Sequence, residues 1–169
     1  MTERTKLLLA VLLGLLLALG GLAAWSIHRT RQAHADHIRD NPERRLARLV
    51  DGARAYYADE HVTAAGDVLP AQFPASAPLT PTASPCAQGA VRYPPEAGLW
   101  DHATWQALRF AVDDPHPYRY EFVAGPTGFT ARALGDLDCD GALSTFERIG
   151  TVDAAGEIHV LSFRNNEVE

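Results

Sequence analysis

The sequence predicts an α+β protein in which a long N-terminal helix, transmembrane and then amphipathic, packs on a four-stranded antiparallel sheet. Three features predict this fold: an uncharged apolar run at residues 7–27, an amphipathic pattern within residues 28–60, and alternating polar and apolar residues after residue 117. The length of 169 residues, with 47% hydrophobic and 21% charged, fits one globular domain with an appendage.

Residues 7–27 form the predicted membrane-spanning segment, and residues 1–6 form a short cytoplasmic start. A helix of this length is about 31 Å long, which matches the hydrocarbon core of a bilayer. The alternative is a cleaved secretory signal peptide, with Gly21 and Ala23 as the small residues that signal peptidase prefers. The apolar run exceeds the usual signal-peptide core of about 7–15 residues, which favours a retained signal anchor.

Residues 28–60 are predicted to form the amphipathic part of the helix. Apolar residues recur at helical spacing between Leu46 and Tyr57, which gives one apolar stripe that should pack on the rest of the domain. The Asn41-Pro42 pair predicts a break near 41–42, because asparagine is a good N-cap and proline fits the first turn of a new helix.

Residues 61–169 are predicted to form an extracytoplasmic globular domain. Its proline-rich segment, residues 70–98, is expected to be a surface loop, because proline is excluded from helix interiors and central strands. A short helix with core aromatic residues is expected within residues 99–110. After it, alternation predicts two hairpins whose strands are 118–124, 129–135, 145–152 and 157–164.

The segment between the two hairpins matches a calcium-binding loop. Its twelve residues, 136–147, place oxygen-bearing side chains and a glycine at the positions that an EF-hand loop requires. The predicted Ca²⁺ ligands are Asp136, Asp138, Asp140, the carbonyl of Ala142, Ser144 and Glu147. Because strands rather than helices are expected on both sides, Glu147 should reach the ion poorly. The alternative is an acidic turn without a metal.

The two cysteines, Cys86 and Cys139, predict one disulfide. Such a bond is typical of an oxidising compartment, which places the C-terminal domain on the periplasmic or extracellular side. In the chain-entropy account, closing a loop of about 53 residues stabilises the fold by roughly 4 kcal/mol. Two unrelated buried thiols are the alternative.

Several segments together resemble type IV pilins and pseudopilins, in particular pilin-like proteins of myxobacterial type. They are "RRLARLVDGARAYYADE", "LWDHATWQALRF" and "FTARALGDLDCDGALSTFE", and the resemblance covers most of the chain. It implies an N-terminal helix whose second half lies on a four-stranded sheet. It also implies a globular part outside the bacterial inner membrane, and assembly into a pilus or a type II secretion-like pseudopilus.

The chain departs from the prepilin pattern at its N-terminus. A prepilin has Gly or Ala before the apolar run and a glutamate within it, whereas here Lys6 precedes Leu7 and residues 7–27 contain no glutamate. An intramembrane glutamate is costly unless it is paired, so this chain lacks a device for subunit registration. An anchored accessory subunit is therefore expected rather than a major pilin.

Catalysis is not expected. Asp113, Asp114 and His116 are neighbouring titratable groups, but no nucleophile motif, zinc motif or phosphate loop accompanies them. A net charge of −6 offers no basic face for nucleic acid. No small-molecule substrate is expected.

The sequence thus predicts a membrane-anchored pilin-like structural or accessory subunit of a type IV pilus or type II secretion-like assembly, with a calcium-stabilised loop. It would be a single-pass inner-membrane protein, with its C-terminal domain in the periplasm or at the cell surface. Its partners would be membrane lipid, through residues 7–27, and other pilin-like subunits or secretion components. The alternative is a tethered calcium-dependent adhesion or ligand-binding module that joins no filament.

Overall fold

The computed structural model describes residues 14, 17, 19–29, 41–90 and 92–165. The chain divides into two compact units, residues 1–40 and 41–169. In the first unit residues 19–29 are helical. Within the described ranges, no helix is both long enough and apolar enough to cross a membrane. Most of the predicted spanning segment at 7–27, and residues 30–40 of the predicted amphipathic helix, lie outside the described residues.

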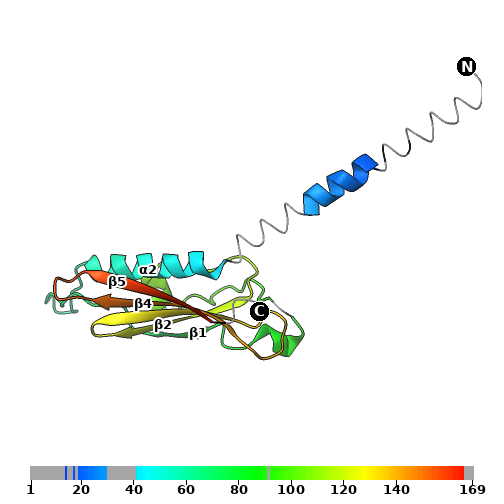
Figure 1. Ribbon diagram of the computed structural model, residues 1–169. Coiled ribbons are helices and arrows are strands. Elements are labelled where there is room, and N and C mark those ends of the chain that lie inside the picture. Colours follow the sequence, from blue (N-terminus) through cyan, green and yellow to red (C-terminus); the bar gives the residue numbers. More distant parts are fainter. Residues whose placement is uncertain (1–13, 15–16, 18, 30–40, 91, 166–169) are drawn as a thin grey trace, which may run out of the picture. The chain divides into compact units, whose positions relative to one another are not determined.

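The second unit is built on a five-stranded antiparallel sheet with the strand order β1-β2-β3-β4-β5 (Figure 1). Its strands are β1 (Ala77–Thr80), β2 (Tyr118–Gly125), β3 (Gly128–Gly135), β4 (Ser144–Val152) and β5 (Ile158–Asn165). The last four occupy the four segments in which alternation predicted strands.

The prediction of a long N-terminal helix on a four-stranded sheet is wrong. The sheet has a fifth strand, β1, and the other helices of the described residues are short: α2 (Pro42–Ala58), η1 (Pro85–Gln88) and α3 (Ala103–Ala107). The strand was missed because it contains Pro78, which is acceptable only where the missing N–H is not needed. Since β1 lies at a sheet edge, that condition is met.

Helix α2 begins at Pro42, the residue where the Asn-Pro pair predicted a new helix. Asn41 has an extended backbone, with φ −62° and ψ 106°, so helical geometry does not pass through it. Its side-chain oxygen accepts hydrogen bonds from the N–H groups of Glu43, at 2.9 Å, and Arg44, at 3.4 Å. These bonds satisfy two of the donors that every helix start leaves without an intrahelical partner.

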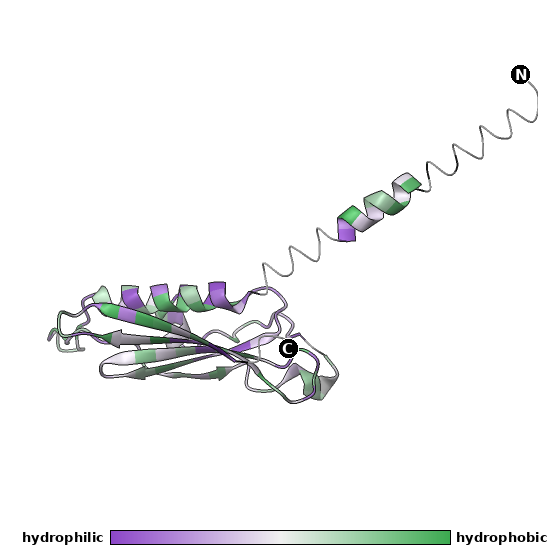
Figure 2. Ribbon diagram, viewed as in Figure 1, coloured by the Kyte–Doolittle hydropathy of each residue, from purple (hydrophilic) through white to green (hydrophobic). Residues whose placement is uncertain are grey.

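One face of α2 is apolar and covers the sheet over β3 and β4 (Figure 1). Figure 2 shows hydrophobic and hydrophilic residues alternating along this helix. Leu46, Leu49 and Ala53 are fully buried on its inner face. They pack in one core with the buried residues of the sheet, which include Tyr120, Phe122, Phe129, Ala131, Ala133 and Phe146.

A second part of the core is formed by the aromatic residues around α3. Trp100 and Trp105 contact each other edge-to-face, with ring centroids 5.6 Å apart, and both contact Phe110. The indole N–H of Trp100 donates to the Val112 carbonyl, and that of Trp105 donates to the Thr80 hydroxyl. The prediction that these aromatics belong to the core is confirmed.

Candidate metal centre

The loop between β3 and β4 brings together three of the predicted calcium ligands. Asp136 follows the last residue of β3, and Asp138 and Asp140 follow at alternate positions. One carboxylate oxygen from each lies within 4.8 Å of the others. Asp136 is half-buried and the other two are exposed, so the cluster faces solvent on one side. A hard cation such as Ca²⁺ prefers this type and density of oxygen ligand.

The backbone of the loop is folded by its own carboxylates. The N–H of Asp140 donates to the Asp138 side chain at 3.2 Å, and the N–H of Ala142 donates to the Asp140 side chain at 2.6 Å. Gly141 has a φ of 90°, which is strained for residues with a side chain and free for glycine. These turns hold the three carboxylates on one short stretch, where their like charges repel unless a cation neutralises them.

A disulfide fastens the middle of the loop. Cys86 and Cys139 are bonded, with their Cα atoms 5.5 Å apart, which confirms the predicted pairing. The Cys86 sulfur also lies 3.5 Å from the Asp136 carbonyl oxygen, and the Cys139 sulfur lies 3.9 Å from that of Ala90. The proline-rich segment therefore acts as a fixed support beside the acidic loop.

Two buried oxygens at the ends of the loop fit a bound ion or its water ligands. Asp136 Oδ1 and Ser144 Oγ are buried, and neither has a hydrogen-bond partner among the described residues. Ser144 is fully buried. Buried polar atoms of this kind normally bind protein groups, water or an ion. Asp136 belongs to the cluster of three carboxylates, whose oxygens are the ligand type that Ca²⁺ prefers, and Ser144 occupies the ninth position of the calcium template.

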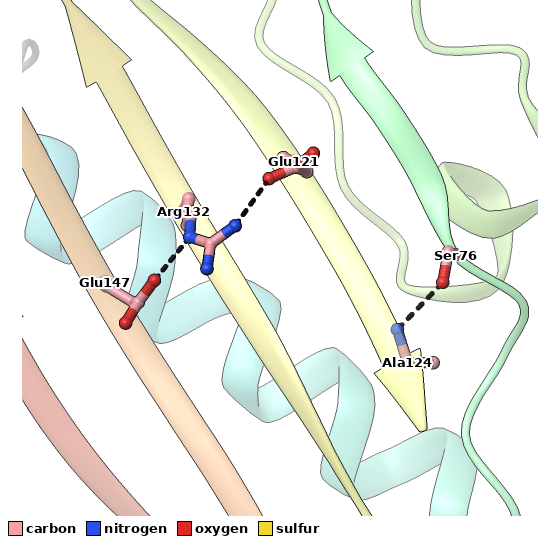
Figure 3. A network of polar contacts seen from close by, with 5 residues as sticks. All are labelled: Ser76, Glu121, Ala124, Arg132 and Glu147. Atoms are coloured by element: carbon pink, nitrogen blue, oxygen red, sulfur yellow. Dashed lines mark hydrogen bonds and ion pairs between the residues drawn. The ribbon is translucent and has the colours of Figure 1, made fainter. Parts of the chain in front are cut away.

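Glu147, the predicted twelfth-position ligand, lies apart from the three aspartates. It sits within β4 and forms an ion pair with Arg132, which also pairs with Glu121 at 3.1 Å (Figure 3). In a strand, three residues advance about 10 Å and the side chain changes face, so Glu147 and Ser144 point to opposite faces. An EF-hand instead has a helix after position nine, which returns the twelfth residue to the ion.

The ion-pair row of Glu121, Arg132 and Glu147 was not predicted. These residues are direct neighbours across β2, β3 and β4, and only the strand register reveals this. The hydrogen bond from Arg132 to Glu147 raises the pKa of Arg132, and the bond to Glu121 raises it further. The signal in the sequence is a charged residue at the same alternation phase in three consecutive strands.

The electrostatic influence of Asp136 extends into the proline-rich segment. Burial raises the pKa of the Tyr93 phenol, the Arg119 charge lowers it, and the Asp136 charge raises it. The Asp136 charge therefore reaches the Tyr93 phenol of the proline-rich segment.

The groups considered for catalysis are used structurally or lie in solvent. His116 is fully buried, and its Nδ1 lies 2.6 Å from the Tyr118 carbonyl oxygen, whereas Asp113 and Asp114 are exposed. His116 also pairs through its backbone with Tyr93. This arrangement supports the loop before β2.

A surface pocket of about 700 Å³ adjoins the disulfide-bonded segment. Five of its thirteen lining residues are proline, and two of its polar residues take part in the local fold. Ser84 accepts a hydrogen bond from the Cys86 N–H, and Arg92 donates to the Pro115 carbonyl.

No known protein family, curated protein or solved structure matches this chain.

Proposed function

We propose that this chain is an exported, noncatalytic structural or accessory subunit, of the kind found in pilin-like assemblies, whose β3–β4 loop binds Ca²⁺. Membrane attachment through residues 7–27 is part of this proposal. The ion would be held by Asp136, Asp138, Asp140 and the Ala142 carbonyl. Ser144 and water would complete the shell.

The observation that carries the proposal is the convergence of three carboxylates on a loop fixed by a disulfide. Such a bond is typical of an oxidising compartment, which supports export. Extracellular calcium modules work with dissociation constants of about 10⁻⁴–10⁻³ M, so a partly exposed site suffices there. Calcium bound only by the folded loop stabilises the native state, which suits a structural role.

The test is thermal unfolding of the full-length protein in detergent micelles, with calcium or after chelation. At a calcium concentration about 100 times the dissociation constant, binding adds about 2.7 kcal/mol of stability. For a domain of this size we expect the unfolding midpoint to rise by roughly 5–10 °C. All samples have equal ionic strength, so charge screening cannot cause the rise in the unfolding midpoint.

The Asp138→Asn variant should lose the calcium response while folding normally without calcium, because the substitution also relieves repulsion in the loop. Asp114→Asn is the matched control, since Asp114 is an exposed carboxylate outside the loop. If wild type shows no rise at about 0.1 M calcium, which is about 100 times the weakest dissociation constant expected, or if Asp138→Asn responds as wild type does, the calcium part of the proposal is wrong.

A further inference from the structure

Strand β5 is an edge of the sheet, and half of its backbone groups point away from β4. The Asp153 N–H donates to the Glu157 carbonyl at 3.0 Å, so Asp153 and Glu157 form a hydrogen-bonded pair. This pair determines which residues of β5 direct their backbone groups toward β4. Because hydrogen-bonded and non-hydrogen-bonded pairs alternate, the N–H and C=O groups of Val160 and Ser162 face outward. Within the described residues, no backbone hydrogen bond outside the β4–β5 ladder uses them.

The two edges of the sheet differ in their protection against further pairing. The β1 edge has only four residues, contains Pro78, and has an irregular register against β2. Short length, proline and irregularity are the devices that block edge-to-edge association. The β5 edge has eight residues, an uninterrupted register with β4, and neither proline nor lysine.

The unprotected edge also carries exposed apolar side chains. Leu161 is 61% exposed and Phe163 is 50% exposed, on the sheet face opposite α2. Leu161 lies beside Ile149 of β4, so the apolar surface continues onto the next strand. At the start of β5, Arg54 donates a hydrogen bond to the Ile158 carbonyl at 3.4 Å, which covers that end only.

We propose that the β5 edge binds the β5 edge of a second copy of this chain, antiparallel about a two-fold axis at Leu161. In this register Val160 pairs with the partner's Ser162 through their outward N–H and C=O groups. By symmetry, Ser162 pairs in the same way with the partner's Val160. It places Leu161 against the partner's Leu161 on the open face, with Phe163 at the diagonal position. A two-fold contact requires such self-complementarity, which a centred antiparallel strand provides.

The charge of β5 is compatible with a second copy of the chain as the partner of this edge. The chain has a net charge of −6, so two copies repel at most surfaces. Strand β5 contains no aspartate or glutamate, and its Arg164 is held by Glu43 of the same chain. Within residues 158–165, two copies can therefore pair without carboxylates on the paired strands. The inference goes beyond the proposed function, because no part of it depends on calcium.

The test is disulfide cross-linking of the Leu161→Cys variant, as full-length protein in detergent micelles at micromolar concentration. Side chains at a directly opposed pair have Cβ atoms about 4.5–5.5 Å apart, close to the spacing a disulfide needs. Val123→Cys is the matched control, because Val123 is also an exposed apolar residue but lies on β2. We expect at least tenfold more covalent dimer from Leu161→Cys.

A second substitution in the Leu161→Cys background tests the backbone pairing itself. Ser162→Pro removes an outward N–H that β4 does not use, so the domain should stay folded while cross-linking falls to the Val123→Cys level. Ser162→Thr, which keeps the N–H, should cross-link normally. Cross-linking no greater than in the Val123→Cys control, or a dimer unaffected by Ser162→Pro in folded protein, would overturn the proposal.

If the Ser162→Pro variant fails to fold, Leu161→Glu in otherwise wild-type protein takes its place. Two carboxylates would then oppose each other on the axis, and sedimentation should show loss of dimer, whereas Val123→Glu should not. Dimer retained in Leu161→Glu would contradict the pairing. The calcium-dependent midpoint is measured separately on these variants, so failure of the two proposals is distinguishable.

Discussion

Glu147 is the residue where sequence and structure assign different partners to one side chain. Its position in the loop template makes it a calcium ligand, whereas its position in β4 gives it Arg132 as a cross-strand neighbour. The arginine is shared with Glu121, so the row places one positive charge between two negative ones (Figure 3). Moving Glu147 to the ion would leave Arg132 with only one carboxylate.

We predict that Glu147→Gln changes calcium affinity less than twofold and lowers the free energy of unfolding by about 0.5–1 kcal/mol. Cross-strand charge pairs contribute about that much when they are partly exposed. Calorimetric calcium titration and urea unfolding measure the two effects, with Thr145→Ser as a neighbouring control in β4. A tenfold loss of calcium affinity would show that Glu147 leaves Arg132 and binds the ion.

At the scale of the element, α2 depends on a close approach that its amphipathic pattern does not reveal. Gly52 lies on the helix where it meets the segment after α3, and a Cβ there would overlap with the Leu108 carbonyl oxygen. The obstacle is backbone, so it cannot rotate away as a side chain would. The glycine is therefore required despite its low helix propensity.

We predict that Gly52→Ala destabilises the domain, although alanine is a better helix former by about 1 kcal/mol. Overpacking of a tight site costs about 1–3 kcal/mol, so the net change in the free energy of unfolding should be a loss of about 0–2 kcal/mol. Urea unfolding measures this, with Arg44→Ala on the exposed side of α2 as the control. A gain in stability would contradict the close approach.

The sequence was informative about elements that have regular alternation of polar and apolar residues or a clear helix cap. Alternation located β2 to β5, and the Asn41-Pro42 pair located the start of α2. Strand β1 was missed because Pro78 argues against strands in general, and edge status depends on the tertiary fold. The Arg132 ion-pair row was missed for a related reason, since register is a property of paired strands and not of one strand.

At the scale of the whole molecule, the disulfide joins two segments that the sheet alone does not connect. Cys86 belongs to the proline-rich segment before β2, and Cys139 to the loop between β3 and β4. Pairing was predictable because the chain contains only two cysteines. The same pairing predicted that the proline-rich segment is fixed to the acidic loop, which the bond confirms. The detailed course of the segment was not predictable, because proline-rich segments lack a periodic pattern.

We predict that the double variant Cys86→Ala, Cys139→Ala loses about 2–4 kcal/mol of unfolding free energy and binds calcium more weakly. The bond restricts the unfolded chain, and it also holds the loop in the conformation that gathers the carboxylates. Denaturant unfolding and calcium titration measure these two losses. Wild-type protein treated with reductant should show the same losses. Unchanged calcium affinity would mean that the aspartate turns organise the loop without the disulfide.

The calcium site itself is tested most directly by a crystal structure of the protein grown with millimolar calcium. The account predicts an ion in the β3–β4 loop, about 2.3–2.6 Å from oxygens of Asp136, Asp138, Asp140 and the Ala142 carbonyl, with Glu147 still on Arg132. A loop without an ion at that concentration, its carboxylates turned apart into solvent, would contradict the account.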